Sequence, residues 1–454
     1  MNNVTIAAVF GVLMAVTSCA AVASDDGDGA AVRRWSDGHP EVSAIFGHPF
    51  TAAGSEHRAN TFVPWPMTKH GSEIGAIQPT VVIARDGEMF VDGYSQKSWE
   101  MAAIGHSVDA GLTWRRLGTD LDLRFRTPEG FKQRGARTNG IGVTQNGSVL
   151  IHFGVQYNDG SDPVASYSDA TFHMHEYVAR TADRGRTWDE AFKLNANDLE
   201  QVGGQKCRFV QLPGDQMGLV LAAWTRATSR GGPVPMQQRY VRTFLYTSDD
   251  DGRTWKRPAE PICDHGWEPD LIVLPSGRLL LAVRYQRMKL PHDLPDLVSP
   301  HHMRSDKPPY TKSKAYDDGL VARFTAVLYS DDGGKTWTQP RLVTGFDEQT
   351  GSLIQLSNGT VLLTFGYKTD TRGQRFMLSY DEGETWSRTV FQLHADGQYA
   401  SSVVLADDTI VTVIHNTKGL QIHSLRWRAP SRDQVEAGGF FTPRVVETLG
   451  VPVK

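Results

Sequence analysis

The stretch SYDEGETW, residues 379–386, places an aspartate, a glycine, a threonine and a tryptophan at fixed spacing. Four other stretches share this frame, which can be written S/T-x-D-x-G-x-T-W: SVDAGLTW (107–114), TADRGRTW (181–188), SDDDGRTW (248–255) and SDDGGKTW (330–337). Internal repetition of a defined unit is typical of repeat architectures, in which each unit folds in the same way.

Each position of the frame has a physical role in a tight connection between two strands. An aspartate side chain can accept hydrogen bonds from backbone N–H groups two residues further on and so close a turn. Glycine adopts positive φ without steric cost. The threonine hydroxyl can bond within the turn, and tryptophan can cover the apolar layer between neighbouring sheets. The frame therefore predicts a rigid hairpin connection.

A second repeat lies between these frames and consists of an apolar strand, a turn and another apolar strand. Its copies are QPTVVIARDGEMFVDGY (78–94), TNGIGVTQNGSVLIHFG (138–154), EPDLIVLPSGRLLLAVR (268–284), TGSLIQLSNGTVLLTFG (350–366), YASSVVLADDTIVTVIH (399–415) and the irregular KCRFVQLPGDQMGLVLAAWTR (206–226). Six such hairpins, five of them followed by the eight-residue frame, predict six four-stranded sheets. We therefore expect an all-β fold, a six-bladed β-propeller.

The sixth sheet lacks the eight-residue frame and needs a strand from elsewhere. The segment LQIHSLRWRA (420–429) is expected to pair with an N-terminal strand from about residues 40–65, which would close the ring and leave few open sheet edges. Residues 40–454 are expected to form one propeller domain.

The eight-residue frame resembles the Asp-box of the sialidase superfamily, and the resemblance covers about residues 70–430. It implies a propeller whose Asp-boxes lie on the rim away from the catalytic face. It also implies an exo-glycosidase that removes a terminal sialic acid, or a related acidic sugar, from a glycan, with no need for a cofactor.

Five of the inner hairpins begin with a polar residue, although the strands that follow are apolar. These residues, found by counting eight positions back from each turn, are Gln78, Thr138, Glu268, Thr350 and Tyr399. Equivalent positions of a propeller face a common space at its axis, so five polar groups there predict a solvent-filled or ligand-binding funnel. The alternative is that the blade starts are ordinary wet loop positions.

The resemblance assigns roles to particular residues. Glu268 opens the fourth blade and Arg284 ends its paired strand, as a glutamate and an arginine do in sialidases. Tyr399 begins the last blade at the place of the tyrosine nucleophile. Arg372 or Arg375 matches the arginine before the fifth Asp-box, and Arg372 is preferred because it precedes the regular strand.

These residue types suit a sugar that carries a carboxylate on its anomeric carbon. An anionic nucleophile would be repelled there, whereas a neutral phenol is not, and sialidases use tyrosine. A phenol with a pKa of about 10 is a weak nucleophile, so Glu268 would take its proton. Arginines would hold the substrate carboxylate through planar pairs of hydrogen bonds. Each residue also has a structural interpretation: a Glu268–Arg284 ion pair, a packed Tyr399 ring and a solvated Arg372.

The chain departs from the sialidase pattern in two places. The R-I-P tripeptide of the first blade corresponds to Ile77-Gln78-Pro79, so one arginine is missing, although Arg137 of the next blade could supply the charge. The acid/base aspartate expected before the first Asp-box is absent from SQKSWEMAAIGHSVDAG, where Glu100 is the nearest carboxylate and His106 another proton carrier.

These departures keep other functions open: a glycosidase or lyase acting on a uronic sugar, and a non-catalytic glycan-binding propeller. A long Pro-rich segment after Arg284 is expected to overhang the funnel. Its histidines, His292, His301 and His302, lack the spacing of a metal site, so we expect no bound metal. The net charge of −4 and pI near 6.4 argue against nucleic acid as a partner.

The N-terminus is typical of an export signal, here assigned to residues 1–23, with an apolar run over residues 4–18 that is too short to span a membrane. Cleavage at a lipobox before Cys19 would leave a lipid anchor, while cleavage after Ala23 would leave a soluble chain; residues 24–39 would form a tether. The protein is expected to be periplasmic, secreted or a cell-surface lipoprotein. Cys207 and Cys263 could pair as a disulfide or remain buried thiols.

Overall fold

The protein is described by a computed structural model over a defined set of residues. These are residues 59–61, 68–76, 78–95, 98–123, 132–158, 172–194, 201–202, 206–225, 240–258, 260–288, 321–344, 348–367, 373–387, 390–394, 399–415, 421–433 and 445–446. The expected export signal and tether, as well as Ile77, Arg372 and the loop histidines, lie outside them. Within the described part of the chain, no helix has the length and apolar character needed to cross a membrane.

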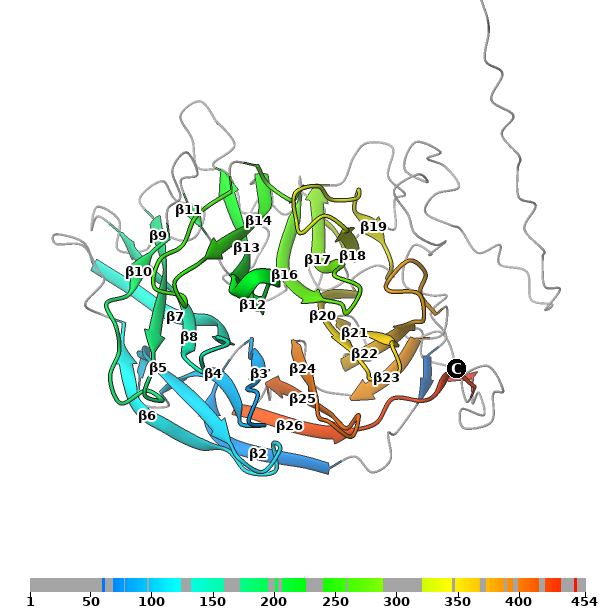
Figure 1. The fold of residues 1–454 in the computed structure, drawn as a ribbon, viewed down its shortest axis with the longest axis horizontal. Coiled ribbons are helices and arrows are strands. Elements are labelled where there is room, and N and C mark those ends of the chain that lie inside the picture. Colours follow the sequence, from blue (N-terminus) through cyan, green and yellow to red (C-terminus); the bar gives the residue numbers. More distant parts are fainter. Residues whose placement is uncertain are drawn as a thin grey trace, which may run out of the picture. The chain divides into compact units, whose positions relative to one another are not determined.

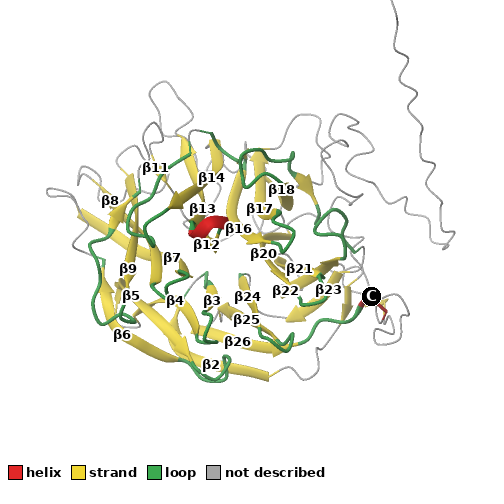
Figure 2. Cartoon of the chain, viewed as in Figure 1, coloured by secondary structure: helices red, strands yellow, loops and turns green. Residues whose placement is uncertain are grey.

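The described elements are almost entirely β-strands, arranged as six blades around a common centre (Figures 1 and 2), of which the first and the last are hydrogen-bonded into one continuous sheet. This confirms the predicted six-bladed β-propeller. In the first five blades the inner hairpin is followed along the chain by strands that pair progressively outward, whereas the last blade takes its outermost strand from the N-terminal side.

Four antiparallel strands build each blade. Blades 1 to 3 consist of β3 (Val81–Ile83), β4 (Met89–Ser95), β5 (Ser98–Ser107) and β6 (Arg115–Asp122); β7 (Lys132–Val143), β8 (Val149–Asn158), β9 (Phe172–Thr181) and β10 (Phe192–Lys193); and β12 (Arg208–Gln211), β13 (Met217–Thr225), β14 (Tyr240–Ser248) and β15 (Cys263–Asp264), with β11 (Gln201–Val202) also paired to β13. Blades 4 to 6 consist of β16 (Gly266–Val273), β17 (Leu279–Met288), β18 (Val321–Ser330) and β19 (Arg341–Leu342); β20 (Glu348–Gln355), β21 (Val361–Tyr367), β22 (Gly373–Ser379) and β23 (Val390–His394); and β24 (Ala400–Val404), β25 (Ile410–His415), β26 (Gln421–Trp427) and β2 (Thr68–Gly75).

The hydrophobic core is divided among the six junctions between adjacent blades. Each junction contains one cluster of buried side chains drawn from the facing surfaces of two neighbouring sheets, including the junction between blade 6 and blade 1. Burial of apolar area is the main favourable term in folding, so each blade depends on both neighbours. This explains why the strands have apolar residues on two faces.

The ring is closed by β2, which pairs antiparallel with β26 at the outer edge of blade 6. In Figure 1 the blue β2 lies beside the red β26. Closure by an N-terminal strand was predicted, but the range of residues 40–65 was wrong, since the strand occupies Thr68–Gly75. The short β1 (Ala59–Thr61) instead pairs with β23 in blade 5, and with β27 (Val445–Val446). The bounds of the closing strand are set by its pairing with β26, and no pattern in the sequence indicated them.

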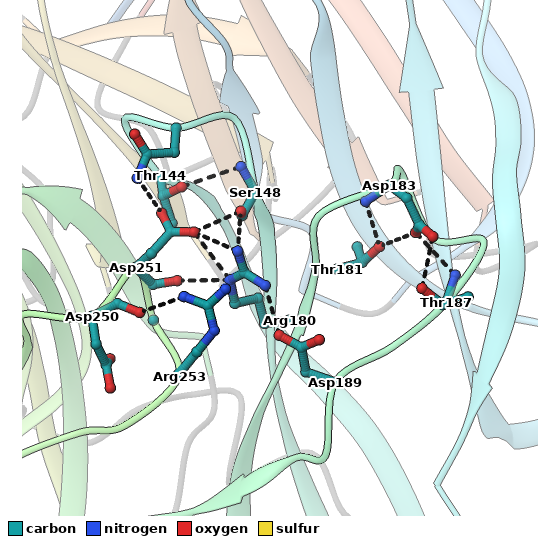
Figure 3. Close-up of polar contacts among 12 residues, drawn as sticks. Thr144, Ser148, Arg180, Thr181, Asp183, Thr187, Asp189, Asp250, Asp251 and Arg253 are labelled. Carbon is teal, nitrogen blue, oxygen red and sulfur yellow. Dashed lines mark hydrogen bonds and ion pairs between the residues drawn. The ribbon is translucent and has the colours of Figure 1, made fainter.

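The five Asp-boxes share one hydrogen-bonded geometry. The first Ser or Thr donates to the aspartate at 2.8 Å in every copy, and the aspartate accepts the N–H of the frame's threonine at 2.8–2.9 Å. The expectation that the aspartate would bond two residues on was wrong, because its main backbone donor is four residues on. Figure 3 shows the copy around Asp183, where Thr187 donates through both N–H and hydroxyl.

Adjacent blades are also tied by polar contacts between an Asp-box and the inner turn of the preceding blade. Arg180 of β9 donates to Asp251 of the third Asp-box at 2.5 Å and to Ser148 at 2.8 Å, and pairs with Asp189 (Figure 3). Asp251 in turn accepts from Ser148 of the blade 2 turn. The boxes therefore join blades at the end of the strands opposite to the blade starts.

Candidate active site

Glu268 lies near the start of the inner strand of blade 4, where regular pairing is interrupted. The register between β16 and β17 shifts between Trp267 and Asp270, and Glu268 has a φ of 45°. A β-bulge turns a side chain away from the direction that regular alternation would give it. The left-handed conformation costs about 1–2 kcal/mol for a residue with a Cβ, so the surrounding structure must hold it.

Thr350 repeats this distortion in blade 5. The register between β20 and β21 shifts between Gln349 and Ser352, and Thr350 has a φ of 67°. Its hydroxyl donates a hydrogen bond to Oε2 of Glu268. The two bulges therefore direct side chains from neighbouring blades toward each other.

The Glu268 carboxylate gathers groups from three blades. Arg284 Nη1, on β17 of the same blade, lies 2.7 Å from Oε1, and the Tyr399 hydroxyl, just before β24 of blade 6, donates to Oε1 at 3.2 Å. Thr350 contacts Oε2 from blade 5. Glu268 is completely buried, and Arg284 and Tyr399 are 5% and 8% exposed. The structure thus brings three of the predicted site residues into direct contact.

The neighbours of Glu268 compensate the cost of burying its carboxylate. An unpaired charge would be costly to bury, and here the guanidinium of Arg284 and two hydroxyl donors compensate it. The same guanidinium lies over the Trp267 ring, 5.3 Å from its centroid, where a cation is attracted by the ring. The Glu268–Arg284 ion pair considered from the sequence is therefore present together with the Tyr399 contact. A phenol within hydrogen-bond reach of a carboxylate can pass its proton to it.

Sequence reasoning missed Lys206, which occupies the equivalent position in blade 3. The turn of this blade is closed by a hydrogen bond from Leu212 N to Gln216 O, as the turn of blade 4 is closed by Leu274 and Arg278. Counted back from these leucines, Lys206 and Glu268 both stand at the sixth residue. Lys206 is fully buried and also has a positive φ, 59°. Alignment on the residue that closes the turn, in place of the irregular Pro-Gly-Asp sequence, would have found it.

A second residue missed from the sequence is Asp92, on β4 of blade 1. Its side chain is buried, and Oδ1 accepts the N–H of Thr80 at 2.5 Å. Burial raises the pKa of Asp92 to about 7, although hydrogen bonds from Thr80 and Thr138 and the charge of Lys206 oppose this shift. A single aspartate inside the otherwise apolar strand MFVDGYS was the signal in the sequence.

Arg375 has a different environment from Arg284. Its Nη1 lies 2.5 Å from Glu348 Oε1, and its guanidinium stacks 3.6 Å above the ring of Tyr367. Both charged side chains are completely buried within blade 5. Arg375 is therefore engaged by a carboxylate of its own blade. The preferred alternative, Arg372, lies outside the described residues.

The remaining predicted residues occupy separate elements. Gln78 is half-buried just before β3, and Arg137 is half-buried on β7, opposite Gly154 of β8. Glu100 is half-buried on β5, two strands outward from the inner strand of blade 1. Their roles stay predictions.

His106 lies away from the blade starts. Its Nε2 is 3.3 Å from Glu88 Oε2, in the inner turn of blade 1, and its ring stacks on Phe90. The turn is at the opposite end of the inner strand from Gln78. The interpretation of His106 as a proton carrier for the site therefore does not fit the structure.

Both described cysteines are free and buried, so the disulfide alternative is not realised. Cys207 Sγ lies 3.0 Å from His152 Nδ1, and His152 Nε2 lies 3.0 Å from Glu176 Oε2. Burial, with the nearby negative charge of Glu176, raises the pKa of Cys207 well above its usual value, which makes it an inert thiol. Across the described parts of the chain, no group of three or more His, Cys, Asp or Glu side chains is placed to hold a metal ion.

The fold and the repeats define a six-bladed Asp-box β-propeller. The family model for the BNR/Asp-box repeat matches residues 328–339, which contain the fourth box. A sialidase of Bacteroides fragilis is 23% identical over 310 residues, which cover 63% of this chain and 46% of that protein. The matched region thus spans about half the length of this relative.

Two solved structures share the fold. A Hadza microbial sialidase superposes with a TM-score of 0.53 and 17% identity, covering 78% of this chain and 66% of that chain. The α-L-arabinanase of Penicillium chrysogenum superposes with a TM-score of 0.51 and 13% identity, covering 79% of this chain and 97% of that chain. Together with the Asp-box match, these findings confirm the predicted resemblance to sialidases and to their propeller fold.

Proposed function

We propose that this protein is an exported retaining exo-glycosidase of the sialidase superfamily, with Tyr399 as nucleophile and Glu268 as its base. The observation that carries the proposal is the contact of 3.2 Å between the Tyr399 hydroxyl and Glu268 Oε1. The similarity to a Bacteroides fragilis sialidase, and a fold shared with a sialidase and an arabinanase, support a glycosidase in general. A terminal acidic sugar, with sialic acid first, is the proposed substrate.

The geometry suits a two-step displacement. In the first step Tyr399 Oη attacks the anomeric carbon and gives its proton to Glu268 as the bond to the leaving oxygen breaks. The ion pair with Arg284 favours the carboxylate form of Glu268, which is the form that accepts the proton. In the second step water replaces the phenol on the anomeric carbon: Glu268 returns its proton to Tyr399, and the water gives its own proton to the group that protonated the leaving oxygen in the first step. Glu100 is the proposed acid for the leaving oxygen.

Two observations favour a second candidate, a glycosidase for another sugar such as a uronic acid or an arabinose. Ile77 replaces the first arginine of the sialidase pattern, and Arg375 is neutralised by Glu348 inside blade 5. A charge-assisted hydrogen bond contributes about 1.5–3 kcal/mol. Loss of one arginine would therefore weaken binding of a carboxylate on the anomeric carbon by tens of fold, which favours a sugar whose carboxylate lies elsewhere or is absent.

The decisive test is turnover of a panel of aryl glycosides by the wild-type protein and by Tyr399→Phe. The panel should contain α-sialosides, uronides and α-L-arabinofuranosides. Phenylalanine keeps the buried ring and removes only the attacking hydroxyl, so we expect an intact fold and a loss of kcat of at least about a thousandfold. Circular dichroism and a thermal melt check the fold.

The outcomes separate the candidates. Normal turnover by Tyr399→Phe would exclude the tyrosine mechanism. Release of unsaturated, ultraviolet-absorbing products would indicate elimination in place of hydrolysis. Binding of sugars with no turnover across the panel would indicate a glycan-binding propeller. The mass of the mature chain from its native host would test export: a lipid on Cys19 or cleavage after Ala23.

A further inference from the structure

The amino group of Lys206 joins three blades at the centre of the propeller. Nζ donates to the carbonyl of Gly351 in blade 5 at 3.0 Å and to that of Ala400 in blade 6 at 2.9 Å. Asp270 Oδ2 of blade 4 lies 3.5 Å away. Because the side chain starts in blade 3, it reaches across the axis. Two carbonyls thus accept N–H groups of the ammonium, and a carboxylate of a third blade compensates its charge.

Each of the two carbonyls that Lys206 contacts belongs to the residue that follows a hydroxyl donor of Glu268. Gly351 follows Thr350, and Ala400 follows Tyr399. Thr350 and Tyr399 are the residues whose hydroxyls donate to the two oxygens of Glu268. Lys206 therefore fixes the backbone next to both hydroxyl donors, although it comes from a different blade.

The ammonium group also balances the charges around Glu268. The ionisable groups that act on Lys206 come from its own strand and from blades 1 and 4: Arg208, Asp92, Asp270 and Glu268. Burial lowers the pKa of Lys206, while the charges of Asp270 and Glu268 oppose this shift. Asp270 is itself held by the N–H of Leu353. The cation thus stands among carboxylates that would otherwise repel one another.

We propose that Lys206 is a positioning residue of the active site, which orients Tyr399 and Thr350 toward Glu268 and keeps Glu268 ionised. This inference rests on the proposed function, since its effect is measured through turnover. A lysine with this role explains why a fully buried cation is placed at a blade start. It acts through the backbone and through charge and does not touch the reacting atoms.

The first test replaces the cation and keeps the volume. In Lys206→Met we expect kcat to fall about 10- to 100-fold, because misplacement of reacting groups is costly. We also expect the acid limb of the pH profile of kcat/KM to shift to higher pH by about one unit, because Glu268 loses a nearby opposite charge.

The control is Arg180→Met, which removes another buried cation that ties two blades, at the Asp-box end of the strands. This variant should be destabilised but should keep the acid limb of the wild type. If Lys206→Met loses thermal stability yet keeps both kcat and the wild-type acid limb, Lys206 is only a structural tie and the proposal is wrong.

Chemical rescue provides a second, independent test. Lys206→Ala removes a propylammonium group, so added propylammonium should restore part of the lost kcat, whereas 1-propanol should not. Equal rescue by both compounds would mean that filling the cavity suffices, which contradicts the role of the charge. The failure of the proposed function is distinguishable from these results, because the wild-type protein itself would then show no turnover on the panel.

Discussion

At the scale of single residues, the site depends on conformations and charges that would each be unfavourable alone. Lys206, Glu268 and Thr350 all have positive φ at the start of an inner strand. Each such conformation costs about 1–3 kcal/mol and persists only where packing determines it. Their polar groups are nevertheless satisfied: Thr350 donates to Glu268, and Lys206 donates to two backbone carbonyls and pairs with Asp270. Strain and buried charge are thus concentrated around Glu268.

Asp92 provides a residue-scale prediction of pH dependence. Its pKa of about 7 in the folded protein exceeds the value of about 3.9 in an unfolded chain. Below about pH 4 the side chain is protonated in both states and the stability is complete. Between about pH 4 and pH 7 the unfolded chain ionises while the folded protein keeps the side chain protonated, so about 4 kcal/mol of unfolding free energy is lost progressively, and the loss is complete above about pH 7.

We therefore expect Asp92→Asn, which can keep the hydrogen bond from Thr80, to be more stable than the wild type above about pH 8 and similar to it near about pH 4. Urea unfolding at both pH values measures the difference. An unchanged pH dependence of stability in the variant would contradict the assignment.

At the scale of elements, the Asp-box is a self-contained connection whose geometry is set by its own side chains. The aspartate and the two hydroxyls form the same contacts in all five copies, and the glycine always has positive φ. Hydrogen bonds from Thr187 lower the pKa of Asp183 to about 2, so this exposed carboxylate stays ionised. Because the contacts are local, the eight residues predict the structure of the hairpin without knowledge of the rest.

Two glycines with similar backbone conformation offer an element-scale prediction. Gly252 of the third Asp-box has a φ of 84°, and a Cβ there would lie 2.6 Å from Leu150 of the preceding blade. Gly277, in the inner turn of blade 4, has a φ of 90° and open space around it. Gly277→Ala should cost about 1 kcal/mol through backbone strain alone. Gly252→Ala should cost about 2–4 kcal/mol, because overpacking against Leu150 is added.

Chemical denaturation measures the loss of unfolding free energy in each of the two variants. Equal losses would show that blade 2 yields to the new methyl group, and that the Asp-box does not pack tightly against its neighbour.

At the scale of the whole molecule, the ring is held by six interblade cores and by one strand exchanged between the ends of the chain. Blade 6 receives β2 from the N-terminal side, and Gly75 at the end of β2 pairs with Tyr94 of blade 1. Without β2, the edge of β26 would expose unpaired backbone groups. Closure therefore links residues more than 300 positions apart.

A truncation series tests the closure. A chain that starts at residue 62 lacks β1 but keeps β2, and we expect it to fold cooperatively. A chain that starts at residue 76 lacks β2 as well, and we expect a lower Tm and a tendency to aggregate. A synthetic peptide of residues 66–76 should restore part of the lost stability. Equal Tm values for the two truncated chains would show that β2 does not close the ring.

The sequence by itself determined the repeat and hence the architecture. The Asp-box and the inner hairpins are local patterns, and six copies of a unit that buries both faces lead to a closed ring. The same count placed Glu268, Thr350 and Tyr399 at equivalent points of different blades. It could not place Lys206, whose turn is irregular, or the residues of the closing strand, which have no pattern of their own.

The tertiary structure alone decided which polar groups meet. Bulges in β16 and β20 turn Glu268 and Thr350 toward each other, and blade order brings Tyr399 to the same carboxylate. The tertiary structure also pairs Arg375 with Glu348 and places His106 beside the inner turn of blade 1. The physical reason is range: the Asp-box connections are fixed by hydrogen bonds within eight residues, whereas the contacts that Tyr399 makes with Glu268 and Lys206 makes with Ala400 join residues more than 100 positions apart and exist only once the blades have come together.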